Sequence, residues 1–158
     1  MANLETFLHS WLRHRLVLVD LVDAFPEDQL DFKPYDQAMP VKELVMHIIF
    51  SANLFVETVK SGELVRPDES SKPQVNSMAD LRRLVREWTE KTKATIAGLS
   101  QEALARKVDV SKILGTSLTG EVILNLMRDH EIHHKGQLYV YARLAGMKEV
   151  PSFVKKDL

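Results

Sequence analysis

Apolar residues recur every three or four positions in four long stretches of the chain, a spacing that places them on one face of an α-helix. The first stretch follows Asn3, a residue type that caps helix N-termini, and is expected to run to about Ala24. Pro26, Pro34 and Pro40 then interrupt the pattern. The apolar positions of this first helix are Leu4, Phe7, Leu8, Trp11, Leu12, Leu18, Val19 and Val22.

The second and third helices have start and stop signals. Pro40 suits the first turn of a helix, because its missing N–H would be unpaired there, and the second helix stops near Gly62. Ser77 and Asp80 resemble a capping box at the start of the third helix, which continues to Gly98. Between these helices, residues 63–76 contain two prolines and two serines and are predicted to form an exposed connection. The apolar positions are Leu44, Ile48, Ala52 and Phe55 in the second helix and Leu81, Leu84, Val85, Trp88 and Ile96 in the third.

The fourth helix is unusual because histidines occupy part of its apolar stripe. It is expected to begin near Thr119 and Glu121 and to end at Gly146, a residue suited to the left-handed conformation after a helix. Its stripe consists of Ile123, Met127, His130, His134, Leu138, Tyr141 and Ala145. Two imidazoles therefore stand where apolar side chains are expected.

The number and length of these helices define the fold class. Residues 99–119 have no clear period; Val108, Val110 and Ile113 fit either a short extended piece or a half-buried loop. Four amphipathic helices of about 20 residues or more, with no repeat and no persuasive strand pattern, predict an all-α protein, an antiparallel four-helix bundle. The length of 158 residues fits a single domain over residues 1–158, because a chain of about 150 residues buries roughly 70% of its unfolded surface.

Composition narrows the classes of partner. Lys plus Arg number 21 and Asp plus Glu 22, so the net charge of -1 disfavours non-specific binding of nucleic acid. No cysteine is present, which excludes disulfides, thiolate metal ligands and a cysteine nucleophile; any thiol chemistry must use a substrate's sulfur. We expect no membrane span, since no apolar run approaches 18 residues, and no secretory signal. A cytoplasmic protein is the default expectation.

Three of the six histidines lie between residues 128 and 137. His130 and His134 differ by about 40° around the helix axis and lie one turn apart, so both can reach one metal ion, whereas His133 points about 60° to the other side of His130. The third ligand should come from another helix, and His47 in the most apolar helix is the candidate. Three neutral imidazoles bind Zn²⁺, Ni²⁺ or Fe²⁺ and leave coordination positions open.

Simpler interpretations compete with metal binding. A single inward histidine such as His47 is more often a hydrogen-bonded core residue, but burying the pair His130 and His134 requires hydrogen bonds or a metal to offset desolvation. His9 and His14 flank the apolar face of the first helix and are expected to be solvated surface residues.

The segment 130–134 also fits the zinc-protease motif H-E-x-x-H, in which the glutamate is the general base. The longer metzincin pattern fails at Val140, and no strand is available to pair with a peptide substrate. Gly136 inside a helix suggests close approach of a helix or ligand, or chance. Gln137 can orient a metal-bound water or cap a buried carbonyl.

The segments 41–48 (VKELVMHI) and 129–138 (DHEIHHKGQL) resemble those of the DinB/YfiT-like family of small metal-binding helical bundles, as do the order and length of the four helices. The resemblance implies that His47, His130 and His134 are metal ligands and that His133 lies outside the ligand set. It further implies a homodimer with a divalent ion, zinc or nickel, and, as in several family members, S-transfer from low-molecular-weight thiols such as bacillithiol or mycothiol.

The leading hypothesis is therefore a transferase in which the bound ion lowers the pKa of a substrate thiol, with a small molecule as the second substrate. Glu131, Asp129 and Gln137 are the candidates for proton acceptor or orienting group, and Glu131 and Gln137 are preferred as catalytic residues. Two alternatives stay open: a metal-dependent hydrolase with hydroxide in the open position, and a non-enzymatic, stress-related metal-binding or interaction module.

Overall fold

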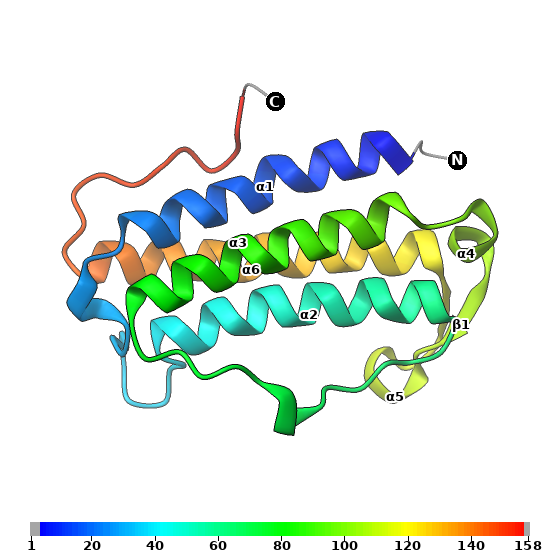
Figure 1. Cartoon of the computed structure of the whole chain (residues 1–158), viewed down its shortest axis with the longest axis horizontal. Helices are drawn as coiled ribbons and strands as arrows, with labels where there is room; N and C mark the ends of the chain where they lie inside the picture. The colour runs from blue at the N-terminus through cyan, green and yellow to red at the C-terminus, as the bar shows by residue number, and fades with distance from the viewer. Residues whose placement is uncertain (1–3, 157–158) are drawn as a thin grey trace.

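Four long helices lie side by side and make up most of the molecule (Figure 1). The structure is a computed structural model and describes residues 4–156, except for the side chain of Glu69. The long helices are α1 (Leu4–Ala24), α2 (Val41–Ser61), α3 (Met78–Ala97) and α6 (Gly120–Leu144). These bounds confirm the four predicted helices, while the expected cap at Asn3 lies outside the described residues.

Local signals in the sequence account for the helix ends. The Ser77 hydroxyl accepts a hydrogen bond from the Asp80 N–H, and the Asp80 carboxylate accepts one from the Asn76 N–H. The predicted capping box is therefore confirmed, with the return hydrogen bond coming from the residue before the N-cap. Gly62 follows α2 with φ 82° and donates its N–H to the Thr58 carbonyl. Pro40 is the N-cap of α2 and not part of its first turn, because the helix begins at Val41.

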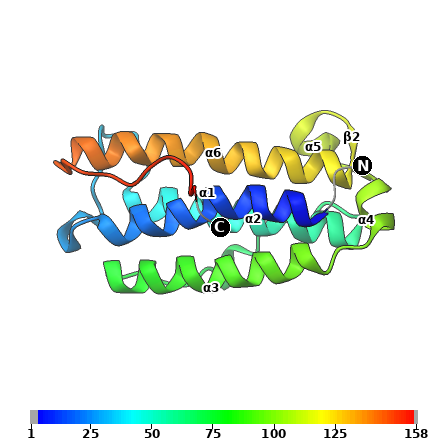
Figure 2. The same ribbon diagram turned by 90° about the horizontal axis from the view of Figure 1, so that it is seen from above.

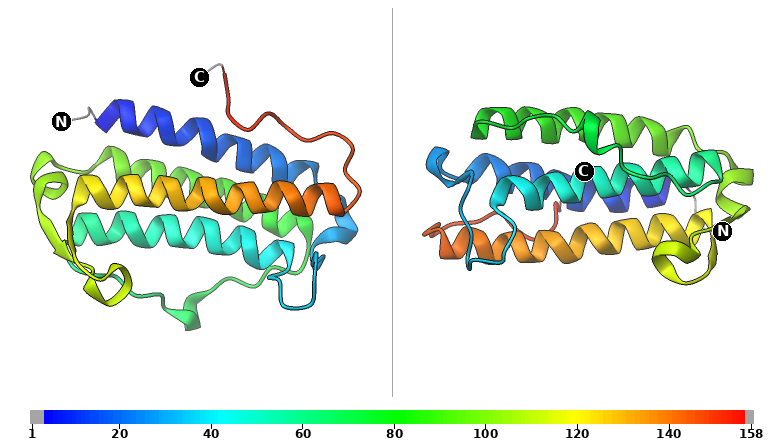
Figure 3. Two further views of the ribbon diagram at one scale, coloured as in Figure 1. Left: turned by 180° about the vertical axis from the view of Figure 1, so that it is seen from behind. Right: turned by 90° about the horizontal axis from the view of Figure 1, so that it is seen from below.

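The direction of the helices follows from the length of the connections. Chain colours in Figure 1 show that α1 and α6 run one way and α2 and α3 the other, because residues 62–77 cross the length of the bundle between α2 and α3. Each of α2 and α1 contacts both α3 and α6 (Figures 2 and 3). The all-α four-helix bundle is confirmed; α2 is antiparallel to its neighbour α6 and parallel to its neighbour α3.

The segment between α3 and α6 contains short elements that the sequence left unassigned. They are α4 (Gln101–Ala105), β1 (Lys107–Asp109), α5 (Ser111–Leu114) and β2 (Ser117–Thr119), and β1 pairs with β2 in antiparallel register. Val108 is therefore in a short strand, the extended alternative considered for it. At Gly120 a Cβ would lie 2.3 Å from the Ala103 carbonyl oxygen, so only glycine lets α6 begin so close to α4.

Helix α2 has the most apolar composition because it is buried against α3 and α6. By length and composition alone it is the one described helix that meets the criterion for crossing a membrane. Its buried side chains, among them Val45, Ile48, Ile49, Ala52 and Val56, belong to the core of the bundle. Burial of apolar surface between helices is the main stabilising term for such a fold.

A buried polar network joins α1 to α6. The Arg15 guanidinium donates from Nε and Nη2 to the two carboxylate oxygens of Glu131 at 2.7 and 2.8 Å, and Trp11 Nε1 donates to the same carboxylate at 2.8 Å. All three residues have no exposed surface. The carboxylate is thus fully partnered, which is the condition under which a buried charge is tolerated.

A second polar contact between α1 and α6 involves His14, which is half-buried and not the solvated residue expected from the sequence. Its Nδ1 lies 3.0 Å from Nζ of Lys135, and Lys135 also donates to the Phe153 carbonyl at 2.7 Å. Burial lowers the pKa of Lys135 to about 8 and, with the nearby Lys135 charge, lowers the pKa of His14. Trp11 and Tyr141, which belong to the predicted apolar stripes of the first and fourth helices, are also buried.

The substitution Glu131→Gln is expected to lower the free energy of unfolding by about 3 kcal/mol or more, because it leaves the buried Arg15 charge without its partner. Glu90→Gln removes an exposed carboxylate on α3 and serves as the matched control, with an expected loss below about 1 kcal/mol. Urea denaturation followed by circular dichroism measures both. Equal losses in the two variants would contradict the structural role of Glu131.

Candidate metal centre

Three histidines from two neighbouring helices meet at one point of the α2 and α6 interface. His47 lies on α2, and His130 and His134 lie one turn apart on α6. The Nε2 atom of His47 is 3.2 Å from Nε2 of His130 and 3.2 Å from Nε2 of His134, and the last two atoms are 3.1 Å apart. The predicted convergence of these three side chains is therefore observed.

The arrangement fits a transition-metal site. Metal–nitrogen bonds of about 2.0–2.1 Å in tetrahedral geometry place two nitrogens about 3.3 Å apart, close to the observed spacing. All three donors are imidazole Nε2 atoms, the ligands that suit Zn²⁺, Ni²⁺ and Fe²⁺. Among the described residues these three histidines are the group whose donor atoms lie close enough together to hold one ion.

The surroundings of His47 and His130 favour the neutral form of the imidazole, which is the form that binds metals. Burial, followed by the neighbouring His134, His47 and His133, lowers the pKa of His130 to about 4. Burial and His134 also lower the pKa of His47. At neutral pH few protons therefore compete with a cation for the Nε2 lone pairs of these two residues.

Gln137 holds the ring of His134 in place. Its Oε1 lies 2.7 Å from Nδ1 of His134, so Nδ1–H donates to it and the lone pair is left on Nε2, the atom that faces the other two histidines. This contact with a candidate ligand differs from the orientation of a metal-bound water and from the capping of a buried carbonyl, the two roles first considered for Gln137. Ser51 is placed similarly one turn after His47, with Oγ 3.5 Å from Nδ1; the spacing of four residues is the signal that could have revealed it.

Other candidate residues lie outside the centre. Glu131 points to α1 and its carboxylate is occupied by Arg15 and Trp11, so the structure does not bring it to the histidines. Asp129 is exposed. His133 is exposed too, and its ring packs on that of His134 with centroids 4.9 Å apart.

Gly136 has no close neighbour within the described chain. A Cβ at this position would meet nothing within 4 Å, and the residue is exposed. One explanation considered for this glycine, that another helix of the chain approaches it closely, is therefore wrong. The cost of glycine within α6 is not offset by tighter packing inside the chain.

Two cavities reach the candidate metal centre. His47 and His130 line the larger cavity, of about 700 Å³, and His47 also lines a second cavity of about 490 Å³. Ser51, Leu54 and Pro67 contribute to both, so the cavities adjoin along one side of α2. The connection between α2 and α3 forms the outer wall of both, which the sequence could not show because it only predicted an exposed segment there.

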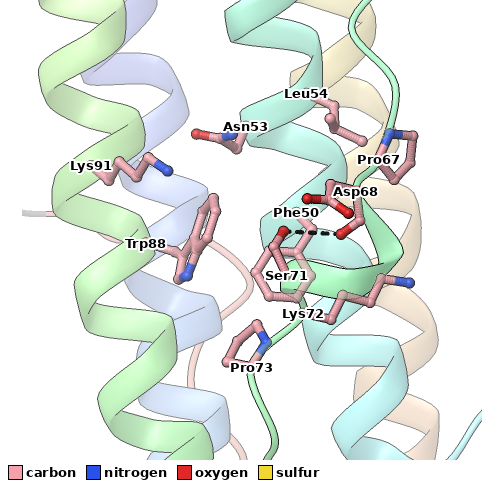
Figure 4. Close-up of a pocket in the computed structure, with 10 residues that line it drawn as sticks. All are labelled: Phe50, Asn53, Leu54, Pro67, Asp68, Ser71, Lys72, Pro73, Trp88 and Lys91. Carbon is pink, nitrogen blue, oxygen red and sulfur yellow. Dashed lines mark hydrogen bonds between the residues drawn. The ribbon is translucent and has the colours of Figure 1, made fainter.

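A third cavity, of about 240 Å³, is separate from the histidines. It lies between α2, α3 and the same connection, where Trp88 and Lys91 face Phe50 and Asn53 (Figure 4). The rings of Phe50 and Trp88 pack edge to face with centroids 4.7 Å apart. No imidazole lines this cavity.

Comparison with known proteins identifies the family. The model of the DinB family matches residues 1–156, and the chain belongs to this family, as the sequence motifs led us to expect. The uncharacterised protein YjoA of Bacillus subtilis (strain 168) is 34% identical over 156 residues, which are 99% of each protein.

Solved structures show the same fold. The crystal structure of YjoA, a DinB-like protein from Bacillus subtilis, matches 96% of this chain and 99% of that chain with a TM-score of 0.83. A DinB-like protein from Bacillus cereus ATCC 10987, 19% identical, matches 94% of this chain and 95% of its own with a TM-score of 0.76. The second similarity concerns the fold alone.

Alanine at His47, His130 or His134 is expected to lower the affinity for Zn²⁺ more than about 100-fold, because each substitution removes one of three donors. His133→Ala is the matched control, since His133 is exposed on the same helix and outside the donor group. Isothermal titration calorimetry with a competing chelator measures the affinities. An equal loss in the His133 variant, or none in the His134 variant, would rule out this donor set.

Gln137→Ala is expected to weaken Zn²⁺ binding by about 10-fold to 100-fold, because His134 loses the group that fixes its tautomer and ring orientation. The free energy of unfolding without metal should be almost unchanged, since Gln137 is exposed. The same calorimetric titration checks the affinity. Wild-type affinity in this variant would show that the contact with His134 has no role in the centre.

Proposed function

We propose that the protein binds a divalent ion, Zn²⁺ or Ni²⁺, through His47, His130 and His134 and is a metal-dependent transferase that activates a low-molecular-weight thiol. The observation that supports this most is the triangle of Nε2 atoms, 3.1–3.2 Å apart, at the place where two cavities adjoin. A transfer reaction needs room for two reactants, and two cavities that share His47 provide it. The proposal retains the homodimer and the cytoplasmic location expected from the sequence.

The donor set matches the chemistry that a transferase of this kind requires. A divalent ion held by the centre supplies positive charge that favours the thiolate over the thiol. The three imidazoles are neutral donors and leave that charge undiminished. The chain has no cysteine, so the reacting sulfur belongs to the substrate.

The net reaction is a substitution at carbon. The S–H bond of the thiol breaks and its proton passes to solvent. An S–C bond forms at the electrophilic carbon, and the bond from that carbon to the leaving group breaks, with the leaving group taking the electron pair. Gln137 acts through His134 as a positioning residue, and Glu131 is assigned to the bundle core and not to this reaction.

A purely structural metal site is less consistent with the cavities. A structural zinc site is closed by four protein ligands, whereas here three donors meet and two of them line open space. The metal-dependent hydrolase uses the same donors and differs in its second reactant, which is water and not a thiol. Thiol dependence therefore separates the leading proposal from this alternative.

The zinc-loaded protein is expected to consume 1-chloro-2,4-dinitrobenzene in the presence of a thiol from a panel of cysteine, glutathione, bacillithiol and mycothiol. His130→Ala should lower the rate at least about 100-fold, because it removes a metal ligand, and His133→Ala should retain it. Absorbance of the thioether product reports the rate.

Two outcomes would contradict the proposed activity. Hydrolytic turnover of ester substrates without added thiol would favour the hydrolase. Stoichiometric metal binding with no turnover of any thiol, together with a loss of stability on chelation, would favour the non-enzymatic module.

A further inference from the structure

We propose that the larger cavity binds an amphiphilic anion, a molecule with an apolar body and one carboxylate or phosphate group, beside the metal centre. The inference rests on the proposed function, in which this molecule is the electrophilic partner of the thiol. A cavity of about 700 Å³ is within the range that holds a small organic ligand.

The cavity walls are mainly apolar and come from three separate segments in addition to His130 of α6. Helix α2 supplies its inner side, the connection after α2 its outer side, and α5 its end. Ile113 on α5 is 55% exposed, which is high for an apolar side chain and means that it has surface available to a ligand. The apolar lining residues are Leu54, Phe55, Leu64, Val65, Pro67 and Ile113.

The charged residues of the cavity are all cationic. Arg66 on the connection and Lys112 on α5 line it, and no aspartate or glutamate is among its described lining residues. The whole chain has a net charge of -1, so this excess of positive charge is local. Guanidinium and ammonium groups form their strongest hydrogen bonds with carboxylate and phosphate oxygens.

The cationic wall is held to the bundle by a specific contact. Thr58 is 2% exposed, and its hydroxyl accepts a hydrogen bond from the Val65 N–H at 3.0 Å. This bond fixes the connection next to Arg66 against α2. The backbone that carries Arg66 therefore has a defined position beside the cavity.

The smaller cavity differs in charge, which assigns the anion to the larger one. Glu43 and Lys72 both line the smaller cavity, so it presents both signs of charge. It also lacks His130. The larger cavity combines an apolar interior, charged residues that are all positive, and two of the three histidines.

Decanoate, decan-1-ol and decyltrimethylammonium share one alkyl chain and differ in the charge of the head group, and they are the probes for this cavity. Isothermal titration calorimetry below the critical micelle concentration measures their binding to the metal-free protein. Decanoate is expected to bind about 10-fold more tightly than the alcohol, with the cation weakest, because only the carboxylate pairs with Arg66 and Lys112.

The double variant Arg66→Gln and Lys112→Gln is expected to remove the preference for decanoate while retaining binding of the alcohol. Lys33→Gln with Arg83→Gln changes the net charge equally at exposed positions outside the cavity and should retain the preference. Equal binding of decanoate and decan-1-ol by the wild type, or loss of the preference in the control variant, would overturn the inference.

The variant His134→Ala separates this inference from the proposed function, because His134 is a candidate ligand but does not line the cavity. Decanoate should bind this variant as it binds the wild type. If decanoate binds both proteins and neither binds Zn²⁺, the proposed function fails and the anion site stands. If Zn²⁺ binding and thiol transfer are found but decanoate does not bind, only the anion site fails.

Discussion

The buried contact between Glu131 and Arg15 fixes which face of α6 points to which neighbour. A carboxylate without exposed surface must keep its charged partner, so residue 131 has to face α1. In a helix, His130 and His134 lie about 100° and 60° from residue 131 on the same side of the axis. Since α6 contacts both α1 and α2, that rotation turns the two imidazoles toward α2 and His47. The packing of the bundle core and the geometry of the candidate centre thus depend on the same rotation of α6 about its axis.

Desolvation has a useful effect at the centre. The same burial that makes an unpaired imidazole costly lowers the pKa values of His47 and His130 and keeps them as neutral donors. The third ring is oriented from outside by Gln137, which is exposed. The two cavities border the donors on the side of α2 that faces the connection between α2 and α3. Helices α2 and α6 therefore supply the donors, and the connection after α2 supplies the outer wall of both cavities.

Helical periodicity in the sequence predicted the features that lie on the long helices. It predicted little about the residues that lie on the connections between them. The four helices and the shared face of His130 and His134 followed from the spacing of residues on helices, whereas His47 was indicated by its place in the most apolar helix and by the family resemblance. Glu131, preferred from the sequence as a catalytic residue, lies about 100° around the helix from His130 and binds Arg15 and Trp11 on α1. Arg66 and Lys112 could not be placed, since the segments that contain them have no period, and their positions depend on contacts such as that of Thr58 with Val65.

X-ray absorption at the zinc edge of the protein loaded with one equivalent of Zn²⁺ tests the central claim most directly. The account predicts three imidazole nitrogens at about 2.0–2.1 Å, with one imidazole fewer in the His134→Ala variant and no change in the His133→Ala variant. A spectrum without imidazole scattering, or one that is identical in the His134→Ala variant, would contradict it.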